Sequence, residues 1–80
     1  MNIMRSVFQI RPLTLEEGFD LSCEGVLKES SRHGRLIEAV VRAVQLSHNL
    51  RAEIHIFDCD GRVAEIIALP ASPVETAQAA

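Results

Sequence analysis

The sequence contains no tryptophan and no tyrosine, and its three aromatic residues are all phenylalanine. Sites for single-stranded nucleic acid usually stack several bases on aromatic rings, so this scarcity disfavours such a site. The four glycines form neither a glycine-rich phosphate loop nor a nucleophile elbow. We therefore predict no catalytic residue and no bound cofactor.

Long apolar runs are also missing. No run approaches the roughly 18 residues that a membrane span requires. Arg5, Gln9 and Arg11 interrupt the N-terminal region, so we expect neither a signal peptide nor a membrane partner. The two cysteines, Cys23 and Cys59, form no spaced motif, and we expect two buried thiols in a reducing, cytoplasmic setting rather than a disulfide.

The composition that remains is that of a small globular domain. Of the 80 residues, 48% are apolar and 24% are charged, which predicts one domain over residues 1–70 and a tail over 71–80. The formal net charge of −3 makes nucleic acid an unlikely partner. Residues 28–51 form the most positive segment, with five basic residues against two acidic ones.

Two short segments near the N-terminus alternate apolar and polar residues, as half-buried strands do. Residues 6–11 place Phe8 and Ile10 on one face, and residues 19–24 place Phe19, Leu21 and Cys23 on one face. The connector between them is short, so we predict an antiparallel hairpin.

A helix is predicted from Leu36 onward, with Ser30 or Ser31 as its N-cap or a later start at Gly34. Its apolar arc comprises Leu36, Ile37, Val40, Val41, Ala43 and Val44, and we expect this arc to pack on a sheet. Asn49 is expected to end the helix in the left-handed conformation. On a helical wheel His48 lies at the edge of the apolar arc, so we expect its side chain to be half-buried.

A second hairpin is predicted over residues 52–58 and 63–69. Asp60-Gly61 favours a two-residue type I′ turn, which pairs Phe57 with Ala64, and His55 with Ile66. Ile54, Ile56, Val63, Ile67 and Leu69 then form the core face. The opposite face is too apolar for full exposure to water.

From that second face we predict a homodimer interface at Phe57, Ala64 and Ile66. An edge strand with unpaired N–H and C=O groups is an alternative route to a dimer. The overall expectation is an α+β, two-layer fold, in which one amphipathic helix covers a four-stranded antiparallel sheet (ββαββ). Ser72-Pro73-Val74-Glu75 fits a capping box and favours a short C-terminal helix.

Two stretches are similar to a family of short bacterial proteins of unassigned function. Residues 18–25 resemble the second strand of that family, and residues 54–63 resemble its closing hairpin. Phe19 stands where tryptophan is common in the family. The resemblance implies the strand-strand-helix-strand-strand layout and transfers no catalytic residue.

Candidate chemistry in the remaining residues is sparse. Asp58 and Asp60 resemble the opening of a calcium loop, but Leu69 occupies the position of the bidentate acid, so no metal is predicted. The histidines are spread along the chain, and neither cysteine has an activating neighbour.

Two function classes remain from the sequence. The first is a non-enzymatic interaction module that self-associates, with a further protein partner of unknown identity. The second is a weak nucleic-acid or phosphate binder, in which Arg32, Arg35 and Arg42 contact the anion.

Overall fold

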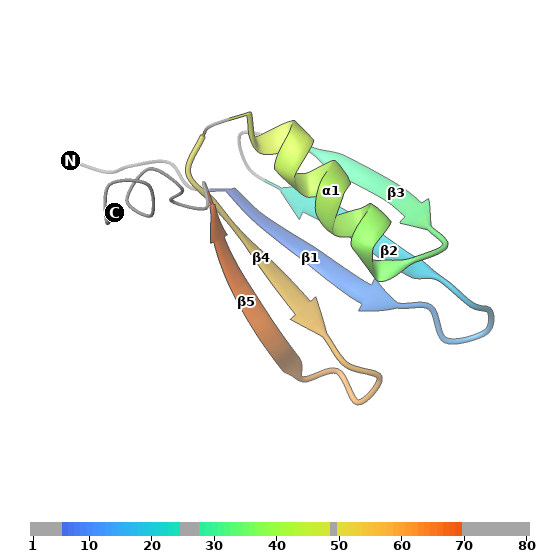
Figure 1. Cartoon of the computed structure of the whole chain (residues 1–80). Helices are drawn as coiled ribbons and strands as arrows, with labels where there is room; N and C mark the ends of the chain where they lie inside the picture. Colours follow the sequence, from blue (N-terminus) through green and yellow to red (C-terminus); the bar gives the residue numbers. More distant parts are fainter. Residues whose placement is uncertain (1–5, 25–27, 49, 70–80) are drawn as a thin grey trace, which may run out of the picture.

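The computed structural model describes residues 6–24, 28–48 and 50–69. Its elements, in chain order, are β1 (Ser6–Pro12), β2 (Phe19–Glu24), β3 (Glu29–His33), α1 (Leu36–Ser47), β4 (Ala52–Phe57) and β5 (Val63–Leu69). Figure 1 shows the strands as one twisted layer and α1 as a second layer on one of its faces. The predicted α+β class is confirmed, whereas the helix predicted in the tail lies outside the described residues.

The sheet has five strands in the order β3-β2-β1-β4-β5. β1 and β4 are parallel, while the other three neighbouring pairs are antiparallel. The prediction of a four-stranded antiparallel sheet is therefore wrong in strand number and in direction. Parallel neighbours require a crossover, and α1 carries the chain from β3 back to the start of β4 (Figure 1). Both predicted hairpins, β1–β2 and β4–β5, are present.

β3 is the strand that the sequence pattern did not reveal. Ser30 and Ser31, expected as helix caps, lie within it and pair with β2. Every residue of β3 is polar or charged, so apolar alternation could not mark it. The N-cap of α1 is Arg35 instead, and its backbone N–H donates to Glu38 Oε1 at 3.3 Å. This bond satisfies one N–H group at the start of the helix.

The core lies between α1 and the middle of the sheet. In the ladder, Phe8 of β1 is flanked by Cys23 of β2 and Ile54 of β4. The buried apolar residues are Phe8, Ile10, Leu21, Cys23, Ala39, Ala43, Ala52, Ile54, Ile56 and Leu69. The predicted inward positions on β1, β2 and β4 are thus confirmed.

α1 ends one residue earlier than the sequence suggests. His48 adopts the left-handed conformation, with φ 50° and ψ 49°, and its N–H donates to the carbonyl of Val44 at 3.3 Å. Asn49, which we expected in this role, lies outside the described residues. His48 is exposed rather than half-buried, because the cap position turns it away from the sheet.

The β4–β5 turn is built around Asp58 rather than around an Asp-Gly pair. The Asp58 carbonyl accepts the N–H of Gly61 at 3.0 Å, and its Oδ1 accepts the N–H groups of Asp60 and Arg62 at 2.9 and 3.0 Å. Of the turn residues, Gly61 alone has a positive φ, at 84°. A type I′ turn requires positive φ at two central residues, so that prediction is wrong.

The wider turn shifts the start of the β4–β5 ladder. His55 pairs with Ile66, as predicted, but an irregularity beside Ile56 makes Phe57 pair with Val63 rather than with Ala64. Val63 therefore shares the face of Phe57, opposite to the core face that we expected for it.

Candidate interaction surface

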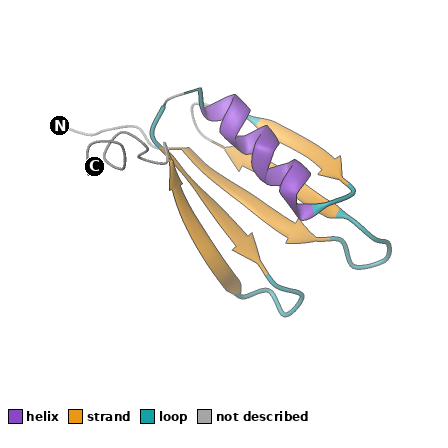
Figure 2. Ribbon diagram, in the orientation of Figure 1, coloured by secondary structure: helices purple, strands orange, loops and turns teal. Residues whose placement is uncertain are grey.

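β5 is an edge strand that no other element among the described residues covers. It is the last strand of the sheet, and α1 packs on β1, β2, β3 and β4 (Figure 2). Its first four residues are exposed whichever face they point to, and only Leu69 is buried. Glu65 is its single charged residue. β5 is thus a mostly apolar strand whose first four residues are open to water on both faces.

The three predicted interface residues lie close together on this hairpin. Ala64 and Ile66 are on β5, and Ile66 is 55% exposed although its side chain is large and apolar. Phe57 lies on β4, where it pairs with Val63. Alternate residues of a strand point to opposite faces, so Phe57 and Ile66 lie on the face that does not carry α1.

Phe57 is more protected than the sequence suggests. The guanidinium carbon of Arg11 lies 3.9 Å from the centroid of its ring, which is cation–π stacking. The same guanidinium donates to Gln9 Oε1 at 3.2 Å. Arg11 reaches Phe57 because β1 and β4 are parallel neighbours, an arrangement that the sequence did not predict.

The face opposite α1 is also less apolar than predicted. His55 Nε2 lies 2.8 Å from Glu53 Oε1, and both side chains are half-buried on β4 beside β5. The unprotected apolar surface on this face is therefore concentrated on β5 and its turn, at Val63 and Ile66.

A second apolar surface runs along α1. Ile37, Val41 and Val44, which we expected in the core, are about half exposed. α1 approaches the sheet through the small residues Ala39 and Ala43, so the contact is centred on them. The larger residues Ile37, Val41 and Val44 consequently lie on the side of the helix and on its surface away from the sheet.

This helix stripe, Ile37–Val41–Val44, turns partly toward the uncovered end of the sheet. Arg42 contacts β3 through Glu29. At about 3.6 residues per turn, Ile37 and Val44 lie on the flank opposite Arg42, which is the flank toward β4 and β5. The helix stripe thus lies toward the β5 edge of the sheet, whereas Val63 and Ile66 lie on the opposite face of that edge.

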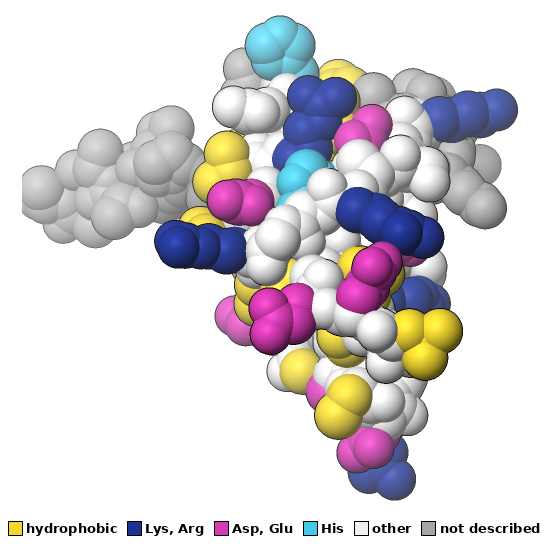
Figure 3. All heavy atoms as spheres, turned by 90° about the vertical axis from the view of Figure 1, so that its right-hand side faces the viewer, with side chains coloured by type: hydrophobic (Ala, Val, Ile, Leu, Met, Phe, Trp, Pro, Cys, Tyr) yellow, Lys and Arg dark blue, Asp and Glu magenta, His cyan; other side chains and the backbone are white. Residues whose placement is uncertain are grey.

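The three arginines of the predicted anion site are not brought together. Arg32 points to the face opposite α1 and lies 3.1 Å from Glu16 Oε2. Arg42 lies on α1, on the other side of the sheet, 3.2 Å from Glu29 Oε2. Arg35 is the helix N-cap. On the face shown in Figure 3, positive and negative side chains are intermixed and form no large basic area.

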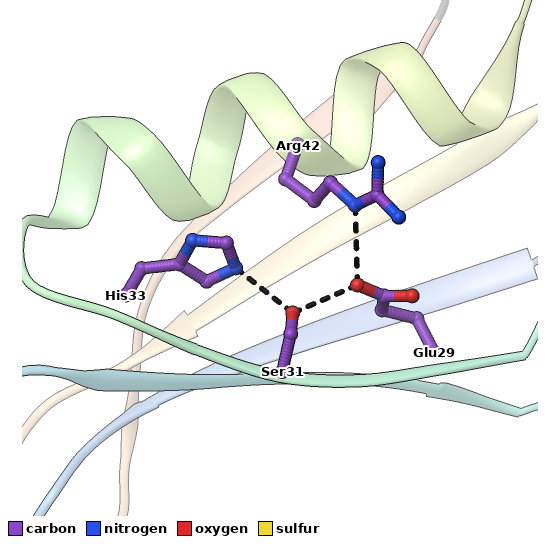
Figure 4. Close-up of polar contacts among 4 residues, drawn as sticks. All are labelled: Glu29, Ser31, His33 and Arg42. Atoms are coloured by element: carbon purple, nitrogen blue, oxygen red, sulfur yellow. Dashed lines mark hydrogen bonds and ion pairs between the residues drawn. The ribbon is translucent and has the colours of Figure 1, made fainter.

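A polar cluster occupies the space between β3 and α1 (Figure 4). Ser31 Oγ donates to Glu29 Oε2 at 2.8 Å and lies 2.8 Å from His33 Nε2, while Arg42 Nε donates to the same carboxylate oxygen. The bond from Ser31 lowers the pKa of Glu29 below its ordinary value, and Arg42 acts in the same direction. These contacts explain how a polar strand can pack beneath the helix.

The order of groups in this cluster is not that of a nucleophilic triad. A serine nucleophile gives its proton to histidine, and the histidine in turn bonds the acid. Here the single hydroxyl proton of Ser31 is donated to Glu29, so His33 must act as the donor toward Ser31. The cluster is arranged to hold β3 against α1 rather than to activate Ser31.

A shallow depression lies at the carboxyl ends of the parallel strands β1 and β4. It has a volume of about 450 Å³ and includes Arg11, Leu13, Phe57 and Cys59 in its lining. The chain leaves β1 and β4 in opposite directions here, which is the topology that often forms ligand crevices in open sheets. Cys59 is an exposed free thiol, contrary to our expectation of burial, whereas Cys23 is buried as predicted.

Within the described ranges, no group of three or more histidine, cysteine or acidic residues is placed to hold a metal ion. The helix of that same part of the chain is too short to cross a bilayer. Comparison with family models, with curated proteins and with solved structures found no match. The resemblance to a family of short bacterial proteins therefore stays a prediction.

Proposed function

We propose that the protein is a non-enzymatic interaction module that self-associates through β5. The observation that carries the proposal is the exposure of β5 on both faces, with Val63 and Ile66 about half exposed. Monomeric proteins usually shorten or charge such edges, or cover them. A second chain would remove this apolar surface from water, which is the dominant driving force for most associations.

The proposal of a binding role rather than catalysis is supported by the polar groups near α1. Ser31, Glu29, His33 and Arg42 are engaged with one another, and their hydrogen-bond order does not activate the serine. The alternative function, anion binding by Arg32, Arg35 and Arg42, receives less support because two of these residues form ion pairs on opposite sides of the sheet. We also propose a cytoplasmic setting, since the exposed thiol of Cys59 stays reduced there.

The test is the mass of the chain in solution as a function of its concentration. Sedimentation equilibrium should show a concentration-dependent dimer for the native chain and a monomer for Ile66→Lys. Ile37→Lys is the matched control, because Ile37 is 60% exposed but lies on α1. A native chain that remains monomeric at millimolar concentration would contradict the proposal, and dissociation by Ile37→Lys alone would move the interface to the helix stripe.

A further inference from the structure

The outer side of β5 has the chemistry of an open sheet edge. Every second residue of an edge strand directs its N–H and C=O away from the neighbouring strand. β5 pairs with β4 on its inner side and is the terminal strand of the sheet. Its outer backbone groups can therefore accept another strand without any rearrangement of the sheet.

The other edge of the sheet differs in each of the features that permit pairing. β3 has five residues against seven in β5, and two of them, Glu29 and Arg32, carry charge. Arg32 is exposed and paired with Glu16 across the β1–β2 connection. Charged side chains on a short edge strand disfavour pairing with another chain, so the open edge is β5.

From these observations, and resting on the proposed self-association, we infer that two copies pair β5 with β5 in antiparallel orientation, with Ile66 facing Ile66 of the second copy. This arrangement joins the two five-stranded sheets into one continuous sheet. Both helices then lie on the same face of it, because the two-fold axis is perpendicular to the sheet.

Symmetry limits the register to three choices near the middle of β5. A two-fold axis perpendicular to the sheet must pass between two identical residues, so the centre is Glu65, Ile66 or Ile67. Centring on Glu65 sets two carboxylates directly opposite each other, which destabilises a strand pair. Centring on Ile67 leaves Val63 and Ala64 without partners. Centring on Ile66 uses the whole strand.

The Ile66-centred register also matches side chains along the face that carries Ile66. On this face Ile66 stands opposite Ile66, and Ala64 opposite Ala68, of the second copy. Each Glu65 stands opposite Ile67 rather than opposite the other Glu65, so no two carboxylates meet. The match of apolar residues along one face favours a second copy of the chain over an unrelated strand.

The register can be read directly by a scan of single cysteines. The background is Cys59→Ser, which removes the exposed thiol and retains the buried Cys23. Glu65→Cys, Ile66→Cys, Ile67→Cys and Ala68→Cys are each oxidised under mild conditions and analysed by non-reducing electrophoresis. Circular dichroism checks that each variant keeps the native fold.

The Ile66→Cys variant should form a covalent dimer to near completion. Directly opposite Cβ atoms are about 4.5–5.5 Å apart in an antiparallel pair, and a small approach of the strands brings them to the roughly 3.5–4.5 Å of a disulfide. Two copies of Ala68→Cys are offset by four residues, about 13 Å along the strand, and should remain monomeric on the gel. Mixing Glu65→Cys with Ile67→Cys should produce a covalent heterodimer, whereas neither variant alone should do so efficiently.

Each outcome separates the register from the self-association on which it depends. A maximum at Ile67→Cys or at Glu65→Cys would overturn the Ile66-centred register. A dimer by mass that no cysteine on β5 can cross-link would overturn edge pairing and leave self-association standing. A chain that is monomeric by mass and never cross-links would overturn both. Cross-linking in the Cys59→Ser background itself would identify Cys23 as the source.

Discussion

Shortening Ile66 to alanine should weaken the dimer far more than it destabilises the fold. The substitution removes three carbons, worth about 2.4 kcal/mol if fully buried. Ile66 is 55% exposed in the single chain, so association can gain at most about 1.3 kcal/mol per copy, because edge pairing leaves the outer face of the sheet open to water. Two copies meet at the two-fold axis, so the loss is at most about 2.6 kcal/mol, or roughly 70-fold in Kd.

The effect of Ile66→Ala on the unfolding free energy of the isolated chain should be smaller. The part of Ile66 already buried accounts for about 1.1 kcal/mol of unfolding free energy. Ile54→Ala is the matched control, because Ile54 is fully buried in the core and should lose about 2–5 kcal/mol. Dissociation constants come from sedimentation equilibrium, and stabilities come from urea unfolding at concentrations where the chain is monomeric. An unchanged Kd for Ile66→Ala would refute the assignment of this side chain to the interface.

Three further predictions concern the fold and the alternative function. Gly18→Ala should lower the unfolding free energy by about 1–3 kcal/mol. The φ of Gly18 is +123°, and a Cβ there would lie 2.9 Å from the carbonyl oxygen of His33. A variant as stable as the native chain in urea would contradict this. Because Ser31 and Arg42 lower the pKa of Glu29 in the folded chain, its carboxylate stabilises the fold above the ordinary glutamate range, and this stability is lost as the pH falls through the lowered pKa. Ser31→Ala should make acid unfolding curves shallower in that range, and curves that superimpose on the native ones would remove the role of the cluster. Replacing Arg32, Arg35 and Arg42 together by glutamine should leave retention on a polyanion column nearly unchanged, whereas loss of a strong salt-dependent retention would favour the anion-binding function.

The parts of the fold that the sequence predicted are those with apolar periodicity. β1, β2, β4, β5 and α1 all show it, and all lie near the predicted ranges. β3 shows none, because its inward residues Glu29, Ser31 and His33 form polar contacts beneath α1 rather than joining the core. The parallel pairing of β1 with β4 was not predicted. It depends on which strand β4 pairs with after the crossover through α1, and the local alternation of apolar residues carries no information on that choice.

The candidate surface was predictable in part for the same reason. The alternation in β5 correctly placed Ile66 opposite the core face, and its exposure is confirmed. The contact of Arg11 with Phe57 depends on the β1–β4 pairing and so could not be foreseen. The exposed helix stripe, Ile37–Val41–Val44, arose because the apolar arc of α1 is wider than the row of small residues that touches the sheet.

Backbone amide exchange on β5, measured residue by residue as the concentration is raised, tests the proposed association most directly. Pairing of β5 with β5 should protect alternate amides of Val63–Leu69, those directed away from β4, as dimer forms, while the outer amides of β3 continue to exchange rapidly. Outer amides of β5 that exchange as fast as those of β3 at every concentration would contradict it.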